Sequence, residues 1–179
     1  MPSNISYVEQ KENRHLHTYQ KLVKKYDGNF ITVDPGGRKN GGTGISFFSG
    51  GELTETSLWC SEEREYYSRS SQICRMFEFD LSKQRVAYPI FIEEPTFFDS
   101  HKGHTAARSD ALFKLTMHYG RLYQIAQEHF TTIPLKINHW KGQMTDKMVG
   151  TRVKRIFRHT FQVYIQSAVG MGLYLTGKL

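Results

Sequence analysis

Short apolar runs alternate with longer, spaced apolar patterns along this chain, which is typical of a protein that mixes strands and helices. The first run covers residues 30–33 and stops at Asp34, where Pro35 and two glycines end the strand. Two further apolar runs, at residues 45–48 and 53–59, follow glycine-rich turns. Three consecutive strands joined by such turns predict an antiparallel meander.

The rest of the chain alternates between helical and strand patterns. Pro134 places its strand at an edge of the sheet or near its start. Gly120 interrupts the longest helix, and we expect it to allow close approach of that helix to the sheet. Thr145 is placed to cap the helix that follows it. We predict helices over residues 61–81, 106–130, 145–157 and 163–176, and strands over residues 86–92 and 132–137.

The resulting order, β-β-β-α-β-α-β-α-α, predicts a mixed α/β sheet covered by helices. With 179 residues the chain has room for one full domain, which we assign to residues 29–179. Residues 1–28 are a basic N-terminal extension, in which residues 17–26 form either a short helix or part of a solvated tail. No apolar run approaches the length of a membrane span, and the first residues lack the apolar core of a signal peptide.

Charge is the first indication of a partner. Lys and Arg number 24 against 17 acids, which gives a net charge of +7. The surplus is concentrated between residues 136 and 158, and no carboxylate side chain follows Asp146. Such a region favours polyanions, because neutralising phosphates releases their counterions. The basic residues of this stretch are Lys136, Lys141, Lys147, Arg152, Lys154, Arg155 and Arg158.

Two positions carry carboxylates at the end of an apolar strand. Asp34 ends the first strand, and Glu93 and Glu94 end the fourth. If these strands pair in parallel, the acids meet at one edge of the sheet. Carboxylates gathered there repel one another unless a hard cation such as Mg²⁺ binds them, and two such ions can hydrolyse a phosphodiester. The alternative is that Asp34 begins a turn and the two glutamates are surface acids. Spacing leaves both interpretations open.

A set of motifs, taken together and in order, carries a family resemblance. Val-Asp-Pro-Gly-Gly, Gly-Thr-Gly-Ile, Phe-Ile-Glu-Glu-Pro, Leu-Phe-Lys-Leu-Thr-Met-His-Tyr-Gly-Arg-Leu, Trp-Lys-Gly-Gln and Ala-Val-Gly-Met-Gly-Leu follow one another within residues 30–177. This succession resembles RuvC-like Holliday-junction resolvases, especially short phage-type members. The resemblance implies a ribonuclease H-like, five-stranded mixed sheet and a homodimer that cuts four-way DNA junctions with Mg²⁺ or Mn²⁺. It also implies the cytoplasm of a bacterial or phage-infected cell, with an organelle or nucleus as alternatives.

Carried over by position, the resemblance implies that Asp34 and Glu93 bind the metal, with Glu94 beside them. The family normally places a further acid, often with a His, on the last helix, and this chain has Ser167 and Tyr164 there instead. Three explanations stay open: another acid such as Glu94 or Asp146 compensates, the residue was deliberately altered, or the protein is retained for junction binding. The residues we expect to contact DNA are Lys136, Trp140, Lys141, Lys147, Arg152, Lys154 and Arg155.

Several alternatives stay open at the level of sequence. The leading hypothesis is a metal-dependent endonuclease for branched DNA, and the rival is a catalytically impaired or inactive junction-binding protein on the same fold. A third is a nuclease of the same fold that acts on RNA in hybrids or on DNA ends. Trp140 either stacks on a base or packs against the sheet. The His15–His17 and His101–His104 pairs lack the further ligands that a zinc site needs.

Overall fold

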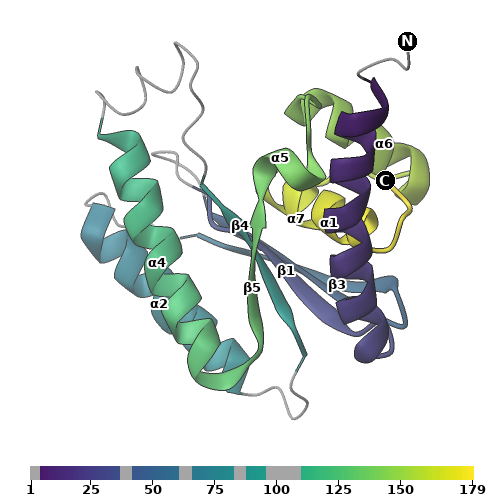
Figure 1. The fold of residues 1–179 in the computed structure, drawn as a ribbon. Helices are drawn as coiled ribbons and strands as arrows, with labels where there is room; N and C mark the ends of the chain where they lie inside the picture. Colours follow the sequence, from purple (N-terminus) through teal and green to yellow (C-terminus); the bar gives the residue numbers. More distant parts are fainter. Residues whose placement is uncertain (1–4, 37–41, 61–65, 83–87, 96–109) are drawn as a thin grey trace.

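A computed structural model describes residues 5–36, 42–60, 66–82, 88–95 and 110–179 (Figure 1). None of the helices in these ranges is both long and apolar enough to cross a bilayer. The elements are α1 (Ile5–Lys25), β1 (Phe30–Asp34), β2 (Thr43–Ser49), β3 (Glu52–Trp59), α2 (Tyr66–Ser82), β4 (Ile90–Glu94), α4 (Ala111–His129), β5 (Thr132–Lys136), α5 (Ile137–Trp140), α6 (Asp146–Phe157) and α7 (Val163–Leu175).

The strands form one five-stranded sheet in the order β3-β2-β1-β4-β5. The pairs β1–β2 and β2–β3 are antiparallel, as the meander predicted, whereas β1–β4 and β4–β5 are parallel. The mixed α/β sheet is therefore confirmed. Pro134 lies in β5, an edge strand, where its missing N–H does not interrupt the sheet.

Helices cover both faces of the sheet (Figure 1). Because successive side chains on a strand point to opposite faces, each strand contributes to two cores. Ile31 and Ile45 pack on the side of α2 and α4, in a cluster that includes Phe77 and Leu122. Phe30, Phe48 and Phe91 pack on the opposite side against α7 and α1. Strands β1, β2 and β4 are thus largely buried, whereas most of β3 is exposed or partly exposed, and the ends of the central strands are free for chemistry.

Glycines let α7 lie directly on the sheet. A Cβ on Gly44 would come within 2.2 Å of the Tyr164 carbonyl oxygen, and one on Gly172 within 2.1 Å of the Phe48 ring. Gly120 behaves differently from our expectation, because it is exposed and a Cβ on it would have no atom within 4 Å. The prediction that Gly120 brings α4 close to the sheet was therefore wrong.

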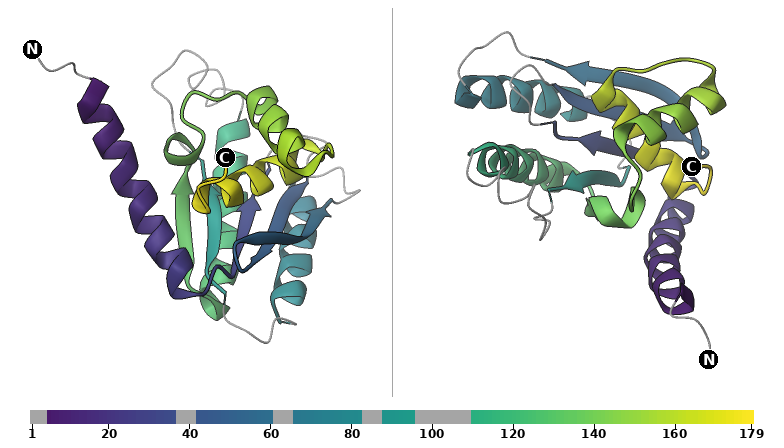
Figure 2. Two further views of the ribbon diagram at one scale, coloured as in Figure 1. Left: turned by 90° about the vertical axis from the view of Figure 1, so that its right-hand side faces the viewer. Right: turned by 90° about the horizontal axis from the view of Figure 1, so that it is seen from above.

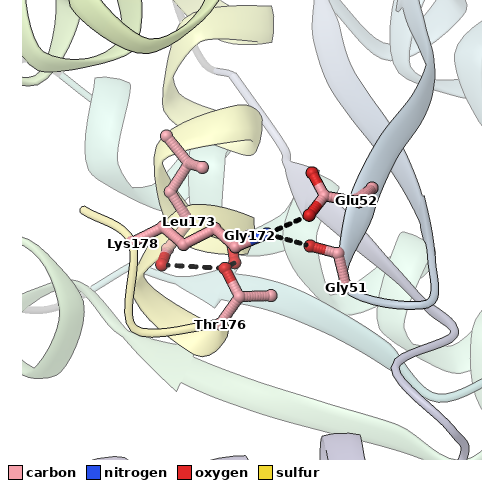
Figure 3. Close-up of polar contacts among 6 residues, drawn as sticks. All are labelled: Gly51, Glu52, Gly172, Leu173, Thr176 and Lys178. Atoms are coloured by element: carbon pink, nitrogen blue, oxygen red, sulfur yellow. Dashed lines mark hydrogen bonds and ion pairs between the residues drawn. The ribbon is translucent and has the colours of Figure 1, made fainter.

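The C-terminal end of α7 is tied to the turn between β2 and β3 (Figure 3). Lys178 donates a hydrogen bond of 3.1 Å to the Gly51 carbonyl and forms an ion pair with Glu52. The Thr176 hydroxyl donates to the carbonyls at the end of the helix, over 3.1 Å to that of Gly172. These contacts fix the far end of α7, while its first turns lie at the carboxyl end of β1.

Helix α1 is longer than the sequence pattern indicated, and its N-terminal part stands away from the body (Figure 2). Its C-terminal half packs on the domain, where Val23 joins the core and Tyr19 hydrogen-bonds to His139 over 3.2 Å. His15 stacks on His139 with the ring centroids 4.1 Å apart. The extension therefore contributes to the core, and the division of the chain at residue 28 stays a prediction.

Candidate active site

Parallel pairing of β1 with β4 brings the two predicted acids together. The register matches Thr32 with Phe91 and Val33 with Ile92, so the next step places Asp34 beside Glu93 on the same face. Both line a single cavity of about 340 Å³. The other lining residues are Pro35, Gly36, Pro95, Ala111, Leu112, Leu115, Lys141, Asp146, Val163, Tyr164 and Ser167.

Asp34 is held by the turn that follows its strand. The Gly36 N–H donates a hydrogen bond of 2.9 Å to its carboxylate, and Gly36 has φ 60°, a backbone conformation that favours glycine. The Ser167 hydroxyl also hydrogen-bonds to this carboxylate. Burial raises the pKa of Asp34 to about 6, although the hydrogen bonds from Gly36 and Ser167 work in the opposite direction. These neutral donors orient the carboxylate in the cavity but do not cancel its negative charge.

Glu93 lies in a less favourable electrostatic environment. Burial, and next the negative charge of Asp34, raise its pKa well above the usual value for a glutamate. Among the described residues, its carboxylate has no hydrogen-bond or ion-pair partner. Acids with strongly perturbed pKa values cluster at functional sites, which makes this pair a candidate active site.

Lys141, directly after α5, and Asp146, at the start of α6, add one cation and one further acid. Lys141 and Asp146 form an ion pair at the cavity wall. The charge of Lys141 lowers the pKa of both Asp34 and Glu93, and that of Asp146 raises both. Lys141, which we expected at the DNA, therefore belongs to the cavity. Asp146, one of the two acids that the sequence offers as compensation for Ser167, lies at this cavity, whereas Glu94 does not line it.

Helix α7 closes the cavity on the side where the family places its last acid. Ser167 and Tyr164 both line the cavity, so the positions expected to carry an Asp and a His do face the site. Thr32 fixes the position of this part of α7 relative to β1, because its hydroxyl donates a hydrogen bond of 2.7 Å to the Ala168 carbonyl. The departure from the family pattern thus lies inside the site itself.

A buried histidine that the sequence did not single out supports the Asp34 turn. His118 of α4 hydrogen-bonds to Thr43 over 3.0 Å and to Ser70 over 2.9 Å. The Thr43 hydroxyl in turn donates to the Pro35 carbonyl over 2.9 Å. Burial lowers the pKa of His118 to about 4, so the ring is neutral. The sequence could not reveal this network, because Thr43, Ser70 and His118 lie on three elements that are far apart along the chain.

Most of the predicted DNA-contacting residues are on the surface. Lys147, Lys154 and Arg155 of α6 are exposed, and Arg152 is partly exposed. Lys136 is exposed at the end of β5, in register with Glu94. The opposite face of α6 carries Val149 and Val153, which are buried against α7. Helix α6 starts at the cavity, because its first residue, Asp146, lines the cavity. The exposed basic residues follow along the helix from Lys147 onward.

Two residues lie elsewhere than the site hypothesis required. Trp140 is 2% exposed, and a Cβ on Gly170 would come within 3.1 Å of its ring. It packs in the core, so the expectation that it stacks on DNA was wrong. Glu94 does not line the cavity either. It directly follows Glu93 on the same strand, so its side chain points to the opposite face of the sheet.

The described residues contain no group of three or more His, Cys, Asp or Glu side chains close enough to form a ready-made metal site. The His101–His104 pair lies outside the described residues. His15 instead stacks on His139, away from the cavity lining. Among the described residues, the acids that line the cavity are Asp34, Glu93 and Asp146.

No family model and no curated protein matches this sequence. Among solved structures, it is similar to T. thermophilus RuvC in complex with Holliday junction substrate, with a TM-score of 0.57 and 14% identity. The match covers 82% of this chain and 91% of that one. A Thermus thermophilus RuvC structure matches at a TM-score of 0.55 and 14% identity, over 82% and 92% of the two chains.

The chain has the RuvC fold. The resemblance predicted from the order of the motifs is thereby confirmed at the level of architecture, including the helix-flanked mixed sheet. The structural match establishes the fold alone, because the identity is only 14%. Activity has to be argued from the residues that line the cavity.

Proposed function

We propose that this protein is a metal-dependent endonuclease that resolves four-way and branched DNA junctions by hydrolysing phosphodiester bonds. The observation that carries the proposal is the placement of Asp34 and Glu93 side by side in a cavity at the strand ends. The basic face of α6 begins at the same cavity. Structural similarity to a RuvC chain that was solved with junction DNA supports the choice of substrate.

The donor set of the cavity fits one Mg²⁺ or Mn²⁺ ion. Mg²⁺ prefers oxygen ligands and is usually held by one or two carboxylates, with water and substrate phosphate completing its shell. Asp34 and Glu93 supply these two carboxylates, and both have raised pKa values that a bound cation would reverse. A second ion would have weaker ligands, because α7 contributes the neutral hydroxyl of Ser167 and no carboxylate.

Each cavity residue has a separate task in this proposal. A bound Mg²⁺ would supply Lewis-acid polarisation of the phosphate and help to activate a water molecule. Asp34 is held in place for binding by the Gly36 N–H and the Ser167 hydroxyl. Lys141, whose side chain is 14% exposed, is placed to neutralise a phosphate oxygen that enters the cavity.

The path of the DNA follows from the position of α6. A strand whose scissile phosphate enters the cavity would pass the exposed Lys147, Lys154 and Arg155 with the neighbouring phosphates. These contacts position the backbone without reading its sequence. Cutting a symmetric four-way junction requires two sites, so we further propose that the protein acts as a twofold homodimer.

The second candidate function is junction binding without cleavage, and α7 is the observation that favours it. Ser167 and Tyr164 face the cavity where the family pattern has an acid and often a His. The basic face of α6 would be retained in such a protein, whereas the metal would be bound too weakly for hydrolysis.

Cleavage of an end-labelled synthetic four-way junction with Mg²⁺ or Mn²⁺ distinguishes the candidates. The matched controls are the Asp34→Asn variant and an RNA–DNA hybrid of the same length, with a native-gel binding lane for each. Paired nicks across the junction that Asp34→Asn abolishes would establish the proposed function. Tight binding without nicks would favour the second candidate, and cleavage of only the hybrid RNA would replace the proposed substrate.

A further inference from the structure

The cavity contains a third carboxylate that does not come from α7. Asp146 lines the cavity together with Asp34 and Glu93, and its charge raises the pKa of both. It is the first residue of α6, a helix that packs against α7. The position on α7 itself is occupied by Ser167.

Several contacts fix Asp146 at this wall. Thr145 caps α6 by accepting a hydrogen bond of 3.3 Å from the Met148 N–H, which sets the start of the helix. The Gln166 side chain donates a hydrogen bond of 2.7 Å to the Asp146 carbonyl, which ties the start of α6 to the residue before Ser167. Gly150 lets the two helices meet there, since a Cβ on it would lie 2.3 Å from the Gln166 side chain.

Acidic side chains outnumber basic ones among the described residues that line the cavity. When ionised, Asp34, Glu93 and Asp146 contribute three negative charges there, against one positive charge from Lys141. Lys141 pairs with Asp146, while Glu93 has no hydrogen-bond or ion-pair partner among the described residues. A carboxylate left unpaired in a partly buried, negatively charged cavity is an independent sign that a divalent cation belongs there.

We propose that Asp146 is the third carboxylate of the divalent-cation site, in place of the acid that α7 lacks, and that Lys141 is its counterion when no cation is bound. This inference rests on the proposed function. When a cation enters, Asp146 turns from Lys141 toward Asp34 and Glu93, and the freed ammonium becomes available to a DNA phosphate. The third carboxylate would thus come from α6 and not from α7.

Mn²⁺ binding to the full chain, measured by calorimetry and by the loss of the free-ion resonance signal, tests this without DNA or cleavage. Asp146→Asn alone would leave Lys141 unpaired beside the site, and that charge by itself weakens cation binding. The informative comparison therefore uses Lys141→Met as background, with and without Asp146→Asn. Glu52→Gln is the matched control, because it breaks a lysine–acid pair at the far end of α7 (Figure 3).

We expect Asp146→Asn to weaken Mn²⁺ binding at least about tenfold in the Lys141→Met background, because losing even a hydrogen-bond partner of a metal ligand costs about 10–100-fold. Glu52→Gln should change nothing. Adding Ser167→Asp to the double variant should restore most of the affinity, because the carboxylate then returns from α7. Such a rescue also shows that the double variant is folded.

If Lys141→Met and the double variant bind Mn²⁺ equally tightly, the role of Asp146 is overturned and it is only a partner of Lys141. The absence of rescue by Ser167→Asp in a folded variant would also contradict the relocation of the acid. Failure of the proposed function looks different, since the wild-type protein would then bind no Mn²⁺ and cut no junction.

Discussion

The Thr32 hydroxyl and the Ala168 carbonyl are joined by a buried hydrogen bond of 2.7 Å. Thr32 lies two residues before Asp34 on β1, and Ala168 directly follows Ser167 on α7. The Thr32 hydroxyl also contacts the Ser46 hydroxyl at 2.5 Å. The Thr32 side chain therefore links β1, β2 and α7 next to the cavity. It thereby fixes where Ser167 lies relative to Asp34.

Replacing this hydroxyl tests that alignment. We expect Thr32→Val, which keeps the shape of the side chain, to lower the free energy of unfolding by about 1–3 kcal/mol, because buried polar partners are left unsatisfied. Urea denaturation measures the change. Thr32→Ser retains the hydroxyl and should lose less. Equal losses in the two variants would show that the methyl group, and not the hydrogen bond, holds α7.

The two glycines Gly44 and Gly120 should respond in opposite directions to a single methyl group. Gly44→Ala would place a Cβ 2.2 Å from the Tyr164 carbonyl, so α7 must move, and we expect a loss of about 1–3 kcal/mol or more. Gly120→Ala meets no atom within 4 Å and lies in a helix, so it should gain up to about 1 kcal/mol. Thermal unfolding of the pair decides this, and a neutral Gly44→Ala would contradict the close approach.

Asp34 should destabilise the metal-free protein. Burial raises its pKa from 3.8 to about 6, so between these values the native state binds more protons than the unfolded chain, and stability falls as pH rises. At pH 7.5 the penalty is on the order of 1–3 kcal/mol. Asp34→Asn removes the charge and should therefore stabilise the protein in urea denaturation with a chelator present. A destabilised variant would show that the carboxylate is needed for folding.

Much of the fold was predictable because strand ends and turn residues are local features of the sequence. Asp34 and Glu93 both follow apolar runs, and their meeting requires only that β1 and β4 be parallel neighbours. Helix α1 was harder to predict, because its length depends on packing of Val23 and Tyr19 against the domain. Leu16, Tyr19, Leu22 and Val23 recur at a helical spacing, but residues 9–15 are all polar, so the pattern does not show where the helix begins.

The parts of the site that sequence could not locate come from loops and from tertiary contacts. Asp146 reaches the cavity through the path of the α5–α6 loop and the hydrogen bond from Gln166, which no spacing encodes. Trp140 was misjudged because a basic neighbour suggests DNA stacking, whereas Gly170 on α7 opens the space that buries it. Gly120 shows the reverse error, since a helix glycine can simply face solvent.

His118 predicts an acid limit to stability. Burial, with the charge of Arg121 adding to it, lowers the pKa of His118 from 6.5 to about 4. Between these values the unfolded chain binds more protons than the native state, so stability falls as pH drops, by about 3 kcal/mol over the window. Asp34 titrates with the opposite sign, so we compare wild type with His118→Gln at pH 7 and pH 5. The difference in unfolding free energy between them should shrink at pH 5, and a constant difference would contradict a neutral buried ring.

The basic face of α6 makes a prediction that depends on salt. If Lys154 and Arg155 each neutralise a phosphate, Lys154→Ala with Arg155→Ala should lower the slope of log K against log salt by about 0.9 per contact. Binding of a four-way junction is measured in the Asp34→Asn background, so that cleavage does not interfere. Arg75→Ala is the control, because Arg75 is exposed on α2, which covers the other face of the sheet. An unchanged slope in the α6 variant, or an equal change in Arg75→Ala, would mean that the DNA does not follow α6 away from the cavity.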